Sequence, residues 1–288
     1  MIGRLLPWST GTAAWNMALD EALLRSYEQG KAPLTLRFYG WTPPALSLGC
    51  FQQPLTAEQQ AWCRQAGVDW VKRPTGGRAV FHDDELTYAL VAGARDGFAG
   101  PVLADYQKIA LGLKRGFALL GLAVELASGP RQTEGYPSQL CFAASSWYEI
   151  TYQGRKLVGS AQLRQDKALL QHGSILLTFN PLFWVEGGEK APTTGSKNTI
   201  TKQVIGLEEA LGYRPPRSAI LSALQQGLGE VLGIRWQAGS LSAEELSVAT
   251  QLMEEKYTKA DWNNRRGRKS LTGGEGRRQR RRAHERTP

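Results

Sequence analysis

Apolar residues recur every three or four positions in several segments of the chain, the spacing expected of one buried helix face. The segment over residues 17–29 stops at Gly30, and the segment over 106–120 stops at Gly121. Glycine just past the last periodic residue is a common helix end. The pattern therefore predicts helices at these two places, and further helices over residues 55–66, 200–229 and 243–256.

Alternating and β-branched runs predict strands between these helices. Pro43 and Pro44 force a turn after the first strand. Gln153-Gly154 supplies a tight hairpin turn, and a two-residue turn there places Lys156 opposite Thr151. We expect strands over residues 34–39, 45–48, 68–72, 78–82, 86–92, 146–152, 156–164 and 168–178.

The order of these elements favours an α+β fold. Helices and mostly antiparallel strands are mixed without regular βαβ alternation, and the chain contains no internal repeat. A length of 288 residues allows one large domain with a minor part. We therefore divide the chain into a main domain over 1–240, a short helical C-terminal part over 241–262, and a basic tail over 263–288 that we expect to be disordered.

The net charge of +9 is concentrated in that tail. Residues 263–288 hold ten Arg or Lys and two Glu, a charge of +8, and the other 262 residues hold 25 basic and 24 acidic side chains, a charge of +1. The near-neutral body disfavours a nucleic-acid-binding domain. The tail itself allows two interpretations: a solvated extension, or an attraction for an acidic protein or nucleic acid.

Three cysteines, Cys50, Cys63 and Cys141, form a sparse, odd-numbered set without CxxC spacing. This pattern fits neither a disulfide framework nor a zinc site, so it favours a reducing cytoplasm. Three scattered histidines predict no metal centre, and we expect no cofactor. No apolar run approaches the roughly 18 residues of a membrane span, and the first residues lack a signal-peptide layout.

Cys141 and Lys156 lie fifteen residues apart and suggest a nucleophile with its activator. A thiol attacks as its thiolate, which a nearby ammonium stabilises. If the two side chains meet, the pattern favours acyl transfer through a thioester. If they do not, Cys141 is a small buried apolar residue and Lys156 a surface charge.

A glycine loop forms the second candidate site. Gly76 and Gly77 allow backbone amides to approach a ligand closely, and the flanking Arg73 and Arg78 can hold an anionic group. The spacing matches neither a Walker loop nor a dinucleotide fingerprint. Taken alone, paired glycines between strands are also an ordinary turn, and His82 is compatible with a structural role.

Two further small-residue segments allow the same two interpretations. Gly159, Ser160 and Ala161 can leave room beside a ligand or mark a bulge in a sheet. His172 and Gly173 can line a pocket, or the histidine can be a satisfied residue of the core.

Taken together, the motifs resemble one known family. The segments KRPTGGRAVFHDDELTYAL, SWYEITYQGRKLVGSAQLRQ and LLQHGSILL are similar to the lipoate–protein ligase and octanoyltransferase family, which is related to biotin protein ligases. WNMALDEALL, FYGWTPPALSLGCFQ and EEKYTKADWN extend the resemblance over about residues 3–264. It implies a catalytic domain with a mixed, largely antiparallel sheet flanked by helices.

Within this family, the residues around Cys141 resemble the cysteine-dependent octanoyltransferases. ATP-dependent lipoate ligases usually carry an Asn-Asp pair where this chain has Leu140-Cys141-Phe142. The resemblance implies that octanoyl-acyl-carrier protein donates its acyl group to Cys141, that Lys156 lowers the thiol pKa, and that a lysine of a lipoyl-domain protein, such as the glycine cleavage H protein, accepts it. It further implies a substrate channel built from Arg73, Gly76, Gly77, Arg78, His82, Gly159, Ser160, Ala161, His172 and Gly173.

Three alternatives stay open from the sequence. An ATP-dependent lipoate ligase would share the RPTGGRAVFHD and GRKLVGSAQ motifs. An amidotransferase of the same family would use a cysteine elsewhere, which makes Cys50 and Cys63 residues to test. From another class, the chain could be a non-catalytic binding protein that uses its basic tail on nucleic acid.

Overall fold

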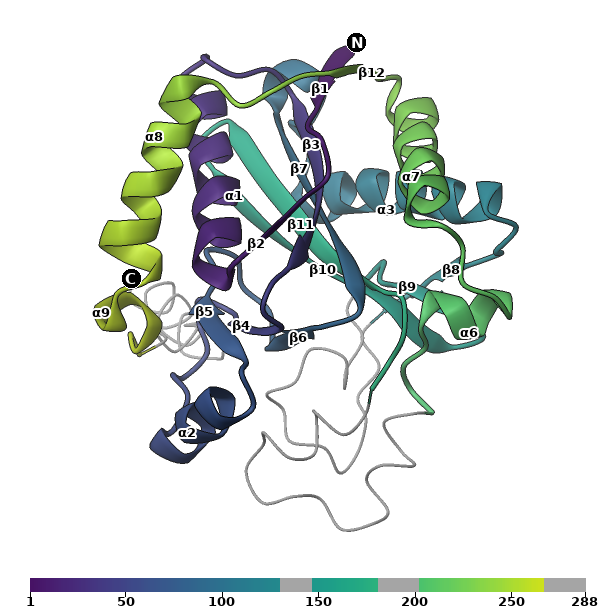
Figure 1. The fold of residues 1–288 in the computed structure, drawn as a ribbon. Helices are drawn as coiled ribbons and strands as arrows, with labels where there is room; N and C mark the ends of the chain where they lie inside the picture. Colours follow the sequence, from purple (N-terminus) through teal and green to yellow (C-terminus); the bar gives the residue numbers. More distant parts are fainter. Residues whose placement is uncertain (130–146, 181–201, 267–288) are drawn as a thin grey trace, which may run out of the picture.

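A computed structural model describes residues 1–129, 147–180 and 202–266, and a large mixed sheet forms its centre (Figure 1). Its strands run in the order β12-β1-β3-β7-β11-β10-β9-β8, with β2 paired to β3. Their bounds are β1 Ile2–Leu5, β2 Ser9–Gly11, β3 Thr35–Trp41, β7 Glu85–Gly93, β8 Glu125–Leu126, β9 Ile150–Tyr152, β10 Arg155–Gln165, β11 Ala168–Leu176 and β12 Arg235–Ala238.

A smaller sheet lies beside the large one. It has the order β5-β4-β6, with bounds β4 Ala45–Leu48, β5 Asp69–Lys72 and β6 Val80–His82. Helix α2, Ala57–Gln65, begins with a capping box between Thr56 and Gln59 and packs on this sheet through Cys63. The glycine loop connects β5 to β6 and so belongs to the small sheet.

The strand pairing confirms the predicted α+β class. The centre of the large sheet, from β3 through β7, β11, β10 and β9 to β8, is antiparallel, and only the β12-β1-β3 edge and β2 pair in parallel. The predicted hairpin is also confirmed, since Lys156 pairs with Thr151. Gln153 and Gly154 have φ angles of 50° and 76°, the left-handed backbone that a tight hairpin turn needs.

Two pairs of helices cover the two faces of the sheet (Figure 1). Helix α1, Ala13–Glu28, and helix α8, Ala243–Leu252, lie on one face, where Ala89 and Val91 of β7 point. Helices α3, Val102–Leu119, and α7, Arg217–Leu232, pack on the other face over Tyr88 and Leu90. The alternation along β7 is that of a central strand buried on both sides.

Several predicted boundaries were wrong by a few residues. Helix α1 begins four residues earlier than expected because Thr12 caps it by accepting a hydrogen bond from the Trp15 amide. Helix α3 likewise begins earlier, directly after Pro101. The helical material predicted over 200–229 forms two helices, α6 Leu207–Leu211 and α7, which Pro215 and Pro216 separate. Strands β1, β2, β8 and β12 were not predicted.

The C-terminal helical residues, α8, a π-helical turn Met253–Tyr257, and α9 Ala260–Asn263, pack directly against the main domain. The side chain of Asn263 accepts a hydrogen bond from the Lys72 amide at 2.8 Å, and Trp262 Nε1 donates to the Lys72 carbonyl at 2.6 Å. These bonds fix the last residue of β5, immediately before the glycine loop. The proposed division of the chain at residues 240 and 262 stays a prediction, and residues 267–288 of the tail lie outside the described residues.

None of the helices in the described ranges combines the length and the apolar character needed to cross a membrane.

Helices α3 and α7 cross so closely that glycine is required at their contact. A β-carbon on Gly227 would lie 2.2 Å from the Gly116 backbone nitrogen and 2.6 Å from the Gly112 carbonyl oxygen. Both distances are far inside van der Waals contact, and the atoms they meet are backbone. The two helices would have to separate to admit a methyl group.

We therefore predict that Gly227→Ala lowers the free energy of unfolding by about 1–3 kcal/mol, as overpacking does, although alanine in an open helix site is favoured by about 1 kcal/mol. Urea unfolding measures the change. Ser222→Ala, on the exposed side of the same helix, is the control and should not destabilise the protein. A Gly227→Ala protein as stable as wild type would contradict the close crossing.

Candidate functional site

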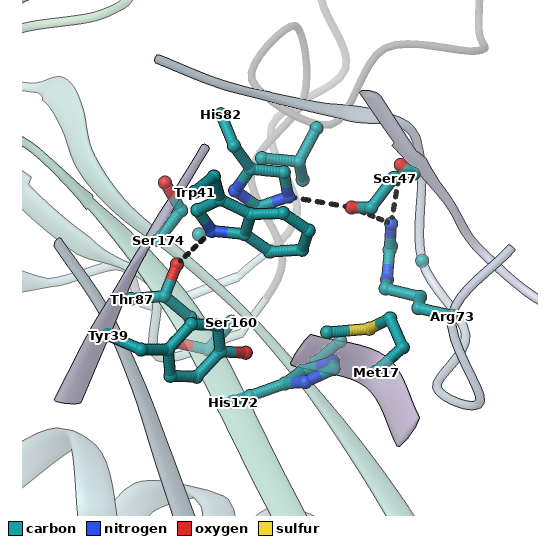
Figure 2. Close-up of a pocket in the computed structure, with 15 residues that line it drawn as sticks. Met17, Tyr39, Trp41, Ser47, Arg73, His82, Thr87, Ser160, His172 and Ser174 are labelled. Atoms are coloured by element: carbon teal, nitrogen blue, oxygen red, sulfur yellow. Dashed lines mark hydrogen bonds between the residues drawn. The ribbon is translucent and has the colours of Figure 1, made fainter. Parts of the chain in front are cut away.

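A cavity lies between the large sheet, helix α1 and the small sheet (Figure 2). It holds about 390 Å³ of space free of atoms, part of it open to solvent. Met17, Trp41, Val80 and Ala161 give it apolar walls. Eight of the residues expected at the substrate channel line it: Arg73, Gly77, His82, Gly159, Ser160, Ala161, His172 and Gly173.

Gly76 and Arg78, also expected at the channel, do not line the cavity. Their carbonyl oxygens accept hydrogen bonds from Arg73 Nη2, each at 2.7 Å. Within the described residues, their contribution is therefore to hold the glycine loop around the arginine.

Arg73 is buried and joins the two sides of the loop. Its Nη1 donates to the Ser47 carbonyl at 2.9 Å and to Ser47 Oγ at 3.2 Å, and its Nε donates to Thr75 Oγ1 at 3.1 Å. Only 4% of the residue is exposed. The sequence suggested that this arginine binds an anionic ligand, but these donors form hydrogen bonds with acceptors of the protein itself.

The Thr75 hydroxyl connects Arg73 to the first of the two cavity histidines, His172. His172 Nε2 lies 2.7 Å from Thr75 Oγ1, and His172 Nδ1 lies 2.8 Å from Asp20 Oδ2. Burial lowers the pKa of His172 and outweighs the opposing effect of Asp20, so the imidazole is neutral at pH 7. Because Arg73 donates to Thr75, the hydroxyl can donate to Nε2, which places the imidazole proton on Nδ1 facing Asp20.

Asp20 links this histidine to the large sheet. It accepts hydrogen bonds from Arg37 Nη1 at 3.1 Å and from the Tyr39 hydroxyl at 2.9 Å. Desolvation by burial, followed by the charge of Asp20, raises the pKa of Tyr39 well above its usual value. Strands β3 and β11 thus satisfy Asp20, and β3 also binds Asn16. Glu21 of the same WNMALDEALL segment is bound instead by Lys256 and Tyr257.

The Ser47 hydroxyl connects Arg73 to the second cavity histidine, His82, in the same way. Its hydroxyl lies 2.8 Å from His82 Nε2, and the His82 ring stacks on Trp41 with ring centroids 3.8 Å apart (Figure 2). His82 Nδ1 lies 3.0 Å from Glu85 Oε2, out of line for a hydrogen bond. Glu85 also accepts hydrogen bonds from Thr87 and Ser174, so His82 faces a carboxylate that strands β7 and β11 hold in place.

Two glycines of the site are required by close approach. A β-carbon on Gly173 would lie 2.4 Å from Ser160 Oγ and 2.7 Å from the Tyr88 ring. A β-carbon on Gly49 would lie 2.0 Å from the carbonyl oxygen of Gly77. At Gly173, strand β11 lies too close to β7 and β10 for a side chain. At Gly49, the chain after β4 lies equally close to the glycine loop.

Lys156 is buried, with 3% of the residue exposed, and its Nζ donates to Glu149 Oε1 at 2.7 Å. It lies on β10, three residues before Gly159, where the same strand begins to line the cavity. The backbone of Lys156 pairs with Gln203 and Ile205 at 2.7 and 3.0 Å, which adds a second fixed segment beside it.

The structure describes two of the three cysteines. Cys50 is half-buried and Cys63 is buried, and neither forms a disulfide. Burial raises the pKa of the Cys50 thiol despite nearby Arg73 and Lys72, and it raises the pKa of Cys63 to about 11. Both thiols are therefore poor nucleophiles at pH 7. Cys141 lies outside the described residues.

Sequence reasoning missed nearly half of the cavity wall and the partner of Lys156. Trp41 lies inside the quoted FYGWTPPALSLGCFQ segment, and Glu149 lies inside SWYEI, but neither residue type indicates a site when taken alone. The other unpredicted wall residues are Met17, Tyr39, Ser47, Val80, Thr87 and Ser174.

Within the described part of the chain, no three His, Cys, Asp or Glu side chains are grouped so as to hold a metal ion.

The sequence matches the profile of the lipoyl protein ligase A/B catalytic domain over residues 12–229. Octanoyltransferase LipM of Kyrpidia tusciae is 40% identical over 271 residues, with 91% of this chain and 98% of that protein covered. LipM of Moorella thermoacetica is 41% identical with the same coverage, and LipM of Bacillus subtilis is 36% identical over 273 residues, again with 91% and 98% covered.

Solved structures show the same fold. The bipartite lipoate protein ligase of Thermoplasma acidophilum superposes with a TM-score of 0.75 at 22% identity, covering 94% of this chain and 99% of that one. A lipoate-protein ligase A bound with ATP superposes with a TM-score of 0.73 at 22% identity, covering 92% and 99%. At this identity the likeness establishes the fold alone.

The lowered pKa of His172 predicts a pH dependence of stability. In the unfolded chain His172 has a pKa of about 6.5 and binds a proton at a higher pH than it does in the folded chain. The free energy of unfolding should therefore fall as the pH drops below about 6.5. The slope from this one residue is at most about 1.4 kcal/mol per pH unit. Urea unfolding at pH 7.5, 6.5 and 5.5 measures it, above the range in which carboxylates titrate.

His172→Gln should flatten this slope, since an amide at this position cannot titrate. His284→Gln in the tail is the matched control and should keep the wild-type slope. An unchanged slope in His172→Gln would show that another group is responsible.

Proposed function

This chain belongs to the lipoyl protein ligase A/B catalytic-domain family, and from that premise we propose that it moves an octanoyl group from acyl-carrier protein, through a thioester on Cys141, to a lysine of a lipoyl-domain protein. The predicted family and the predicted enzyme class, an acyltransferase in lipoate assembly, are confirmed by the LipM relatives. The donor, the acceptor and the residue roles are the proposal.

The observation that carries the residue assignment is the position of Lys156. A buried ammonium lies on the same strand as Gly159, Ser160 and Ala161 of the cavity wall. We infer that an acyl chain in the cavity directs its carbonyl end towards this positive charge. A cation at this point can stabilise a thiolate before attack and an oxyanion after it.

Cys141 is the best candidate for the acyl carrier because the other two thiols are disfavoured. Burial raises the pKa of both Cys50 and Cys63. Cys141 is followed by FAASSWYEITYQGRK, the segment that leads to Glu149 and Lys156. A drop in thiol pKa of about two units from 8.5 would convert most of the thiol to thiolate at pH 7.

The reaction then has two steps. The Cys141 thiolate attacks the octanoyl thioester carbon, its C–S bond to the carrier breaks, and the carrier thiolate leaves and takes a proton from water. The neutral amine of the acceptor lysine next attacks the acyl-Cys141 carbon, the new C–N bond forms, and Cys141 leaves as a thiolate. The surplus proton on nitrogen passes to water. Exchange between thioesters requires no ATP, and amide formation drives the second step.

The cavity suits the acyl chain rather than the reacting groups. Met17, Trp41 and Val80 offer apolar contact, while the buried histidines are already engaged with Asp20 and Ser47. His82 and His172 thus hold the wall in shape. The sparse cysteines support a cytoplasmic location for this activity.

Intact mass spectrometry tests the proposal directly. The full chain mixed with octanoyl-acyl-carrier protein in the absence of ATP should gain one octanoyl increment, and an apo lipoyl domain should remove it. Cys141→Ala should abolish the increment, a loss of at least about 100-fold, because the nucleophile is gone. Cys50→Ala and Cys63→Ala are matched controls and should be acylated like wild type. An increment that survives in Cys141→Ala would refute the assignment.

The second candidate is an ATP-dependent lipoate ligase, favoured by the likeness to a ligase structure that holds ATP. Such an enzyme would release pyrophosphate when given lipoate, ATP and an apo lipoyl domain. We expect no release above background. Pyrophosphate formed in proportion to the modified acceptor would replace our proposal with this one.

A further inference from the structure

Glu149 and Lys156 form an ion pair that is almost closed to water. The two side chains are 3% and 4% exposed, and Glu149 Oε1 lies 2.7 Å from Lys156 Nζ. The second carboxylate oxygen, Oε2, is buried without a hydrogen-bond partner. Desolvation makes a buried ion pair of this kind costly to form, so the pair is weak evidence for a role in stability.

The backbone around Glu149 is fixed independently of the pair. The Glu149 carbonyl accepts a hydrogen bond from the Ala127 amide at 2.9 Å, and the Tyr148 amide donates to the Ala127 carbonyl at 2.9 Å. Tyr148 has a φ of 60°, a left-handed conformation that is strained for a side chain of this size and is typical of functional sites. The chain therefore bends at Tyr148 in a way that delivers the carboxylate to the lysine.

The pair also creates an electrostatic conflict with the thiol role of Lys156. A carboxylate in contact with the ammonium cancels much of its charge, which weakens its effect on a nearby thiolate. If thiol activation were the only role of Lys156, the carboxylate would oppose it. The proposed reaction, however, contains a state in which no thiolate exists.

That state is the acyl-enzyme. Once the thiol carries an acyl group it is a neutral thioester, and the Glu149 carboxylate remains as a negative charge in contact with the ammonium. Removing an opposite charge beside a buried ammonium favours loss of its proton, because burial disfavours the charged form. The amine attack that follows builds negative charge on the thioester oxygen. A neutral lysine amine stabilises that oxyanion far less than an ammonium does.

We propose that Glu149 is the positioning residue and permanent counter-ion of Lys156, and that it keeps the lysine cationic in the acyl-enzyme so that the ammonium can stabilise the oxyanion of the second transfer step. The inference rests on the proposed function and deepens it. Lys156 neither gains nor loses a proton in this step; the proton released by the attacking amine goes to water.

The other ionisable groups on the neighbouring elements are accounted for separately. Arg155 pairs with Glu209 of α6 at 2.5 Å. Glu125 on β8 accepts a hydrogen bond from Thr151 at 3.5 Å. Within the described residues 125–129, 147–156 and 202–209, the remaining titratable side chains are Tyr148, Tyr152, Lys202 and Glu208.

The test measures the second step alone. Acyl-enzyme is prepared from octanoyl-acyl-carrier protein, freed of donor, and mixed with an apo lipoyl domain from pH 6 to pH 10, with the acyl increment followed by mass spectrometry. In Glu149→Gln the rate should begin to fall at a pH about 1–3 units lower than in wild type, the shift expected when an opposite charge in contact is removed. Glu149→Asp should restore most of the wild-type profile.

Glu125→Gln removes a carboxylate from the adjacent strand and is the matched control, with an expected profile equal to wild type. A Glu149→Gln profile with the wild-type shape, whether or not the rate is uniformly lower, would overturn the proposal, because a merely structural role scales the rate without moving its pH dependence. Failure of Cys141 to acylate would instead refute the proposed function.

A second measurement on the wild-type protein covers the case in which Glu149→Gln does not fold. NMR of lysine labelled with ¹³C at Cε, with the Lys156 signal assigned by its loss in Lys156→Gln, reports the charge of Lys156 directly. In the acyl-enzyme it should remain that of an ammonium through pH 9. A neutral Lys156 amine at pH 7 would contradict the inference.

Discussion

The buried guanidinium of Arg73 is the junction on which the cavity depends. It donates to Ser47 on β4, to Thr75 in the glycine loop, and to two carbonyls at the far end of that loop. Ser47 leads to His82, and Thr75 leads to His172. An arginine suits this position because its planar fork keeps its charge and offers several donors in fixed directions. A lysine would supply neither the geometry nor the reach.

The two chains of hydrogen-bonded side chains that start at Arg73 each reach a histidine that faces a carboxylate, and groups of the large sheet bind both carboxylates. His172 meets Asp20, which Arg37 and Tyr39 also bind, and His82 faces Glu85 beside Thr87 and Ser174. The polar groups of the cavity wall are thus engaged with each other, which leaves apolar surfaces for a ligand. The charged pair of Glu149 and Lys156 lies apart from this network, near the start of β10. In the part of the chain that the structure describes, the cavity wall and the Glu149–Lys156 pair are therefore two separate groups of buried polar side chains.

Much of this was accessible from the sequence. The hairpin that pairs Lys156 with Thr151 follows from Gln153-Gly154, and glycine-ended apolar periodicity located α1 and α3. Eight predicted channel residues line the cavity because they fall in motifs typical of the family. Boundaries failed where a cap or proline sets the end: Thr12 extends α1, and Pro215-Pro216 divides the helix expected over 200–229. Strand β12 at the edge of the large sheet and its neighbour β1 have four residues each, too few for periodicity alone to reveal.

The sequence by itself determined the family, the α+β class, the candidate thiol and lysine, and the segments around the cavity, because these depend on local pattern and motif. Only the tertiary structure decided that Arg73 binds the protein, that His172 is neutral, and that Glu149 forms an ion pair with Lys156. Each of these depends on which groups burial brings into contact. His172 meets Asp20 across 152 residues of chain, and no local pattern specifies such a pairing. Burial also sets the strength of the interaction, since a charge out of water depends on its partner far more than one in solvent.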